Sequence, residues 1–331
     1  AEEMTGYPAE QDAFHLENLE EQKKVWFSGI GKETFTALQN GFAESGQPVE
    51  LALELDRPEW YTAYLSMESA VFFDAYFRKN QIPDPPIFHP DRLYIGNAFC
   101  PHLAPTEEKL FALMDKACRE SFAITLTFPF LLEENLSETQ QQLQRLTEWC
   151  ERKNKTVELV VNDWGMAEIL KNQTENLIPC LGTLLNKRKK DPRMKYKSGD
   201  TLLFQQNSLN AGFYRDFLAE EFHIHRYEWE SCGYPQEFPP GKNSLHLPFY
   251  QTNTSQYCPL YALCTTGDRG TQQLAEHCPK FCEKYALLYP EHLHMTGRYN
   301  SLFGVDKTFP EIPEMWKNIK GTKPDRIVVN I

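Results

Sequence analysis

The sequence lacks the features that mark membrane or exported proteins. No apolar run approaches the length that a membrane-spanning helix needs. The first residues, AEEMTGYPAEQDAFHLENLEEQ, are acidic and polar, with neither the basic region nor the apolar region of a signal peptide, although a leader already removed would leave no trace. We therefore expect a cytoplasmic protein without a membrane segment.

Several enzyme motifs are also missing. No GxGxxG follows the first expected strand, which weakens a dinucleotide-binding interpretation, and no GxxxxGK[ST] phosphate loop occurs. The GxSxG of serine hydrolases and the HExxH of zinc peptidases are absent as well. A peptidase function therefore has no motif to support it.

Positive charge is scarce. Lysine and arginine total 34 residues against 46 aspartates and glutamates, which gives a net charge of −12. An acidic chain repels a phosphate backbone, so nucleic-acid binding is not expected. The local exception is the basic stretch that begins at Lys187, for which a solvated loop is favoured over an anion or RNA patch.

The 331 residues show an alternation of strand-like and helix-like segments. Short β-prone runs are expected at 48–55, 92–97, 123–127, 157–161 and 178–185, with helices at 58–78, 107–121, 137–153 and 166–172. Such alternation predicts parallel strands with right-handed crossovers. An α/β fold of the (β/α) barrel type, possibly incomplete or distorted, is the leading expectation, and an open doubly wound sheet is the alternative. We expect a polar, partly helical extension over 1–45 and one barrel-like domain over 46–331.

Cysteine supplies the densest chemical signal. Of nine cysteines, Cys264 is followed after thirteen residues by the pair Cys278 and Cys282, whose spacing of four would place both thiolates on one side of a helical turn. Cys100 lies just past an expected strand, at the rim where barrel enzymes build their active sites. Thiolates suit an iron–sulfur cluster or zinc, and spacing does not separate the two. The remaining cysteines are interpreted as packing residues (Cys118, Cys150, Cys180) or left open as substitute ligands (Cys232, Cys258).

Polar residues at expected strand ends are the candidates for catalysis. Asn162 and Asp163 end the strand at 157–161, and Asn186 follows the next one. Asp163 could act as a general base, or it could be the N-cap of the following helix. Glu228 lies in an expected strand at 223–230, where an inward-facing carboxylate would be a candidate acid or base and an outward-facing one would be a solvated charge.

The sequence resembles the collagenase-like peptidase superfamily (family U thirty-two) and, within it, the UbiU/UbiV-type proteins of oxygen-independent ubiquinone synthesis. The resemblance covers about residues 90–305 and rests on four stretches: LYIGNAFC ending at Cys100, VNDWG at 161–165, GTLLN at 182–186, and Cys264 through Cys282 with the hairpin-like 294–304 after it. One departure is Leu263, which stands where the family has an arginine.

The resemblance implies a function. It implies a 4Fe–4S cluster held by Cys100, Cys264, Cys278 and Cys282, within a cluster-binding segment at 257–305, with zinc as the alternative metal. It further implies an enzyme of anaerobic metabolism that performs oxygen-independent hydroxylation or a related group transfer on a small, possibly aromatic, metabolite. A non-catalytic cluster-bearing subunit with a homologous protein partner is the alternative. A peptidase or RNA-modification factor ranks third.

Overall fold

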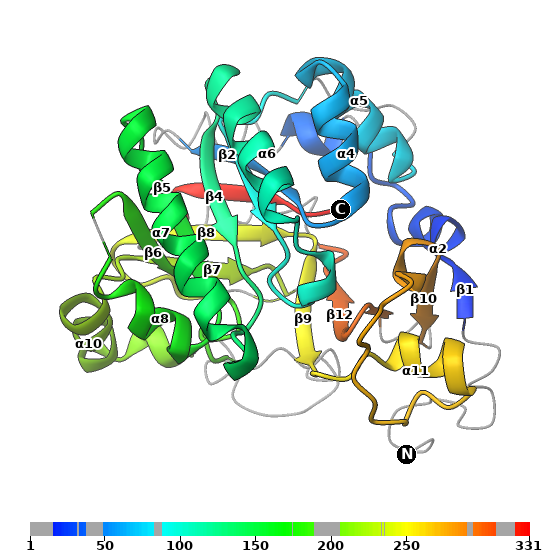
Figure 1. Ribbon diagram of the computed structural model, residues 1–331. Coiled ribbons are helices and arrows are strands. Elements are labelled where there is room, and N and C mark those ends of the chain that lie inside the picture. The colour runs from blue at the N-terminus through cyan, green and yellow to red at the C-terminus, as the bar shows by residue number, and fades with distance from the viewer. Residues whose placement is uncertain are drawn as a thin grey trace.

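Eight parallel strands close into a barrel in the computed structural model (Figure 1). The structure describes residues 16–31, 33–37, 49–82, 88–173, 175–188, 206–232, 234, 236–289, 294–308 and 322–331. The barrel strands are β2 (Glu50–Leu55), β3 (Arg92–Gly96), β4 (Ala123–Thr127), β5 (Val157–Val161), β6 (Leu177–Leu181), β7 (Arg226–Glu230), β8 (Lys242–Leu247) and β13 (Arg326–Val329). Because β13 pairs with both β2 and β8, the sheet has no free edge. The predicted barrel is confirmed, and the open doubly wound sheet is wrong.

Helices cover the outside of the barrel. They are α4 (Pro58–Ser66), α5 (Ser69–Lys79), α6 (Glu107–Arg119), α7 (Leu136–Lys153), α8 (Trp164–Leu170) and α10 (Gly212–Phe222), with short 3₁₀ turns η2 (Pro101–Leu103), η3 (Glu133–Asn135) and η5 (Ser208–Asn210). In α6, residues Leu110, Leu113 and Met114 are buried along one face, as the period of an α-helix requires. Within the described parts of the chain, no helix combines the length and apolarity that crossing a membrane would require.

A second sheet lies beside the barrel and is antiparallel. Its strand order is β1-β10-β11-β12-β9, and all of it except β1 is inserted between β8 and β13. Its strands are β1 (Leu16–Asn18), β9 (Phe249–Thr254), β10 (Tyr285–Leu288), β11 (Met295–Arg298) and β12 (Ser301–Val305). Figure 1 shows β1 and α2 (Leu19–Trp26) next to β10 and α11 (Pro259–Thr266) at one end of the molecule.

Two expectations about individual elements need correction. The helix expected at 58–78 is two helices, because Met67 and Glu68 between them take extended backbone conformations. The described part of the expected 1–45 extension includes α2, as anticipated, but its strand β1 pairs with β10 and so joins the sheet of the C-terminal half. The hairpin-like segment at 294–304 does form the antiparallel pair β11–β12.

Candidate functional site

Five cysteines are candidates for one site: Cys100 in the barrel, and Cys258, Cys264, Cys278 and Cys282 in the segment between β9 and β10. Cys100 follows β3, Cys258 caps the N-terminus of α11, and Cys264 lies in that helix. Cys278 is in a loop and Cys282 is in the 3₁₀ turn η6 (Phe281–Glu283). The helical turn expected for this pair is therefore wrong, because Lys280 between the two cysteines adopts a left-handed conformation (φ 58°) that no α-helix contains.

Four of the five thiols are electrostatic neighbours. Burial raises the pKa of Cys100 to about 12, and the thiols of Cys258 and Cys278 add to that rise. Burial also raises the pKa of Cys282, where Cys100, Cys258 and Cys278 act in the same direction. Burial is the cause of the raised pKa of Cys264, although this thiol also acts on Cys258. In the packing, Cys258, Cys264 and Cys282 all contact the buried cluster of Leu260, Leu263 and Leu287, and Cys282 also packs against the main core that contains Cys100.

The spacing of these thiols bears on the kind of metal group they could hold. Among the described residues, no three cysteine, histidine or acidic side chains are placed to hold one metal ion. A tetrahedral zinc site, with Zn–S bonds of about 2.3 Å, would need its sulfurs within about 4 Å of one another. A four-iron cluster is wider than a single ion, so its thiolates stand further apart. The spacing required of the thiolates therefore differs between the two kinds of metal group.

Two asparagines hold the Cys100 loop in place. The side-chain oxygen of Asn97 accepts hydrogen bonds from the backbone N–H groups of Phe99 (2.9 Å) and Cys100 (2.8 Å). Asn300, in the turn between β11 and β12, donates to the carbonyl oxygens of Phe99 (2.6 Å) and Ser255 (2.8 Å). The chain before Cys258 and the loop before Cys100 are therefore connected through one side chain.

The barrel interior contains a second chemical centre. Glu228 is fully buried there, and Nε2 of His246 lies 2.8 Å from its carboxylate, while Nδ1 of His246 lies 3.6 Å from Glu54. The Tyr94 hydroxyl donates to the same Glu228 carboxylate at 3.2 Å. The inward-facing alternative for Glu228 is thus the one the structure shows, and the glutamate is part of a carboxylate–imidazole–carboxylate arrangement.

The protonation of His246 follows from its two partners. Burial alone would lower its pKa, but hydrogen bonds to Glu228 and Glu54 outweigh burial and raise the pKa to about 10. The ring is therefore an imidazolium at neutral pH, and it neutralises part of the charge of the two glutamates. Because both ring nitrogens face a carboxylate, the imidazolium holds Glu54 and Glu228 together across the barrel.

Below this centre lies a layer of ion pairs. Arg326 forms two hydrogen bonds with Glu158, of 2.6 and 3.0 Å, and also donates to the Tyr94 hydroxyl at 2.8 Å. Burial would raise the pKa of Glu158, but Arg326, Arg92 and Arg226 bring it down to about 2. This layer fills the N-terminal half of the barrel with paired charge.

The predicted rim residues are in three different situations. Both carboxylate oxygens of Asp163 accept backbone N–H groups, from Met166 (2.9 Å) and from Leu131 (2.8 Å), so Asp163 serves as the N-cap of α8. Asn162 donates to the carbonyl of Phe128 (3.0 Å), and Asn186 donates to that of Glu228 (3.1 Å). The side-chain oxygens of both asparagines are buried without a hydrogen-bond partner among the described residues.

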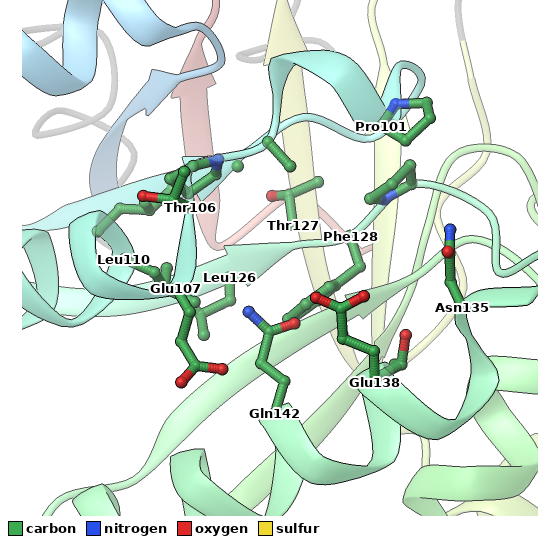
Figure 2. A pocket seen from close by; sticks show the side chains of 16 residues that line it. Pro101, Thr106, Glu107, Leu110, Leu126, Thr127, Phe128, Asn135, Glu138 and Gln142 are labelled. Carbon is green, nitrogen blue, oxygen red and sulfur yellow. The ribbon is translucent and has the colours of Figure 1, made fainter. Parts of the chain in front are cut away.

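A cavity of about 260 Å³ opens near the same end of the barrel. Its walls come from the ends of β3 and β4, from the segment after Cys100 that begins at Pro101, and from α6 and α7. Figure 2 shows Glu138 and Gln142 of α7 pointing toward Thr127 and Phe128 at the end of β4. The hydroxyl of Thr127 is buried and has no hydrogen-bond partner in the described structure, so a polar ligand could satisfy it.

Sequence reasoning missed His246 and Glu54 and left Cys258 undecided. Glu54 and His246 come from strands 192 positions apart, and no local spacing relates them. The alternation in 242–247 is the one signal that could have placed Ser244 and His246 on the same inner face as Glu228. Cys232, the other possible substitute ligand, instead receives a hydrogen bond from Arg188 at 3.1 Å.

Comparison with known proteins gives no match: no protein-family model, no curated protein and no solved structure is found to be similar to this chain.

Proposed function

We propose that this protein is a cysteine-ligated iron–sulfur protein that binds a 4Fe–4S cluster and acts on a small metabolite. The observation that carries the proposal is the convergence of Cys100, Cys258, Cys278 and Cys282, which come from three separate parts of the chain. Soft thiolates in a partly buried setting are the ligands that such clusters take.

The barrel supports the enzymatic half of the proposal. The Cys100 loop continues through Pro101 into the wall of the cavity, and the His246–Glu228–Glu54 centre lies in the upper part of the same barrel. When bound, the cluster would supply electron transfer or a Lewis-acidic iron. The residues of the chain would bind and orient the substrate, and His246, protonated at both ring nitrogens, would hold Glu54 and Glu228 in place beneath it. The proposed reaction is an oxygen-independent hydroxylation or a related group transfer in anaerobic metabolism.

Iron and sulfide analysis tests the central claim. Protein purified or reconstituted without oxygen is expected to be brown, with about four irons and four acid-labile sulfides per chain. A content of one zinc and no sulfide would show that the cysteines form a structural zinc site instead of a cluster site. If no metal is taken up, the thiols are packing residues and the proposal fails.

The identity of the fourth cluster ligand, Cys258 or Cys264, can be tested directly. Cys264 is the ligand that the spacing and the family resemblance together predict, whereas Cys258, like Cys278, contributes to the raised pKa of both Cys100 and Cys282. Cys258→Ser and Cys264→Ser form a matched pair six residues apart. We expect Cys258→Ser to reduce iron content to well under half and Cys264→Ser to leave it close to the wild-type value. The reverse result would restore the spacing-based ligand set.

A further inference from the structure

The cavity beside β3 and β4 has charge of only one sign in its wall. Of the sixteen residues that line it, Glu107 and Glu138 are acidic, and none is a lysine, an arginine or a histidine. Both glutamates lie in the first turn of a helix, Glu107 in α6 and Glu138 in α7, where a carboxylate is favourable even without a ligand. What a ligand would meet therefore depends on whether each carboxylate already has a cation as its partner.

The two acidic residues differ in this respect. Arg145, further along α7, forms an ion pair with Glu107. Glu138 has no ion pair within the described part of the chain, and its side chain is exposed at the mouth of the cavity. Figure 2 shows its carboxylate beside the side chain of Gln142, on the side of α7 that faces the end of β4. Glu138 thus brings a negative charge to the cavity that no basic residue of the wall neutralises.

The second polar feature of the cavity is a buried hydroxyl. Thr127, which also lines the cavity, is 5% exposed, and its Oγ1 has no hydrogen-bond partner among the described residues. The residue beside it on β3 is Gly96, so that strand places no side chain next to Thr127. A buried hydroxyl without a partner is costly, and a ligand group that bonds to it removes this cost.

Most of the remaining wall is apolar. Leu110 and Leu126 lie on one side of the cavity, and the ring of Phe128 and two prolines, Pro101 and Pro129, provide flat surfaces. The volume of about 260 Å³ is just below the range of about 300–1,000 Å³ that is typical of pockets for drug-sized ligands. The cavity therefore suits a small molecule with a short apolar body and a polar group at each end.

We propose that this cavity binds a small organic cation, a primary amine whose ammonium group pairs with Glu138 and whose apolar body packs against Leu126 and Phe128. A second polar group on the ligand would bond to the Thr127 hydroxyl. An alkylamine is protonated at neutral pH, as lysine is, and a hydrogen bond between an ammonium and a carboxylate is stronger than one between neutral groups. The inference deepens the proposed function by naming the class of the metabolite, and it rests on that function for the reaction that follows binding.

Three probes that differ in one group test the charge preference. 4-Hydroxybenzylamine, 4-hydroxybenzyl alcohol and 4-hydroxybenzoate share a ring and a hydroxyl, and they carry a cationic, a neutral and an anionic group. In calorimetric titrations of the full chain we expect the amine to bind roughly tenfold more tightly than the alcohol, and less tightly as salt is added. The benzoate should bind most weakly, although the N-termini of α6 and α7 would favour it if Glu107 and Glu138 were absent.

Two variants assign the two ends of the ligand. Glu138→Gln should remove the preference for the amine over the alcohol, and Glu151→Gln is the control, since it removes the same charge from an exposed position near the other end of α7. Thr127→Val keeps the shape of the side chain and removes its hydroxyl. It should weaken the binding of 4-hydroxybenzylamine roughly fivefold and leave that of benzylamine, which has no second polar group, unchanged.

The outcomes separate this inference from the function on which it rests. Wild-type protein that binds the alcohol or the benzoate as tightly as the amine would overturn the inference, and so would a Glu138→Gln variant that keeps the preference for the amine. A Thr127→Val variant with unchanged affinity for 4-hydroxybenzylamine would overturn the role of the hydroxyl. Iron analysis of the same samples tests the proposed function: protein that binds the amine but takes up no iron would keep the cation site and lose the cluster.

Discussion

His246 changes the electrostatic environment of its two acidic neighbours. Without it, Glu54 and Glu228 would be two carboxylates in the interior of the barrel with no cation between them. Folding raises the pKa of His246 to about 10, because hydrogen bonds to both glutamates outweigh the opposing effect of burial. The histidine therefore brings a positive charge between two acidic side chains that would otherwise repel each other.

A pH-dependent difference in stability is expected when His246 is replaced. The pKa of His246 is raised from its ordinary value of 6.5 to about 10 by folding, so its contribution to stability is complete below about pH 6.5 and is lost as the pH rises through 10. His246→Gln should lower the free energy of unfolding by about 3–5 kcal/mol at pH 6, since it leaves two buried carboxylates unpaired. The difference from wild type should shrink steadily toward pH 10.5.

Denaturant unfolding of both proteins between pH 6 and 10.5 measures this effect. A difference that stays constant over the whole range would mean that His246 is neutral in the folded protein. In that event the network would be held by hydrogen bonds rather than by charge.

At the scale of elements, the antiparallel sheet depends on a close approach between two strands. Gly304 of β12 pairs with Tyr250 of β9, and a Cβ atom added at Gly304 would lie 2.1 Å from the tyrosine ring. The ring therefore covers the glycine and leaves no room for any side chain. Tyr250 is buried in this position, so it cannot turn out into solvent without exposing its ring.

Gly304→Ala should consequently destabilise the protein by about 1–3 kcal/mol, the usual cost of overpacking a buried site. Gly212→Ala is the matched control, because Gly212 begins α10 and an added Cβ would meet nothing closer than 3.8 Å. There the change should be neutral or slightly stabilising. Thermal unfolding of the two variants measures the contrast, and equal midpoints would mean that Tyr250 moves aside freely.

Much of the barrel could be predicted because its strands have a recognisable local sequence pattern. The runs at 123–127 and 157–161 are short, apolar and β-branched, and they form β4 and β5 over the predicted residues. The antiparallel sheet could not be predicted in the same way. Its first strand, Leu16–Asn18, is a polar tripeptide whose pairing with Tyr285–Leu287 depends on contacts about 270 residues away.

Only those parts of the candidate site whose residues are close together in the sequence could be predicted. Cys278 and Cys282 are close in the chain, so their proximity in space could be anticipated even though the turn between them is not α-helical. Cys258 joins them through the packing of α11, and Glu54 meets His246 across the barrel. Tertiary contacts of this kind produce no periodic pattern in the sequence. Asp163 shows a different difficulty, because an aspartate at a strand end gives the same sequence pattern whether it caps a helix or binds a ligand.

At the scale of the whole molecule, the last described residue is held by an early helix. The Tyr76 hydroxyl on α5 donates to the carbonyl of Ile331 (3.0 Å) and accepts from its backbone N–H (3.2 Å). This contact fixes the end of β13, the strand that closes the barrel against both β2 and β8.

Tyr76→Phe should therefore lower the free energy of unfolding by about 1–3 kcal/mol, because two buried backbone groups lose their partner. Tyr285→Phe is a suitable control, since Tyr285 is 38% exposed. Hydrogen exchange of the backbone amides of 326–331 should accelerate in Tyr76→Phe and remain unchanged in the control. Unchanged protection in both variants would show that strand pairing alone secures the end of β13.

The position of β13 in the chain has a consequence for biosynthesis. After β2 is made, a ribosome must add more than 270 residues, including the whole antiparallel insertion, before β13, which closes the barrel between β2 and β8, exists. Until then, β2 and β8 present unpaired backbone edges of the kind that invite association with other chains. The nascent barrel is thus exposed along these two edges until β13 is made, and a factor that shields strand edges would act on it during that interval.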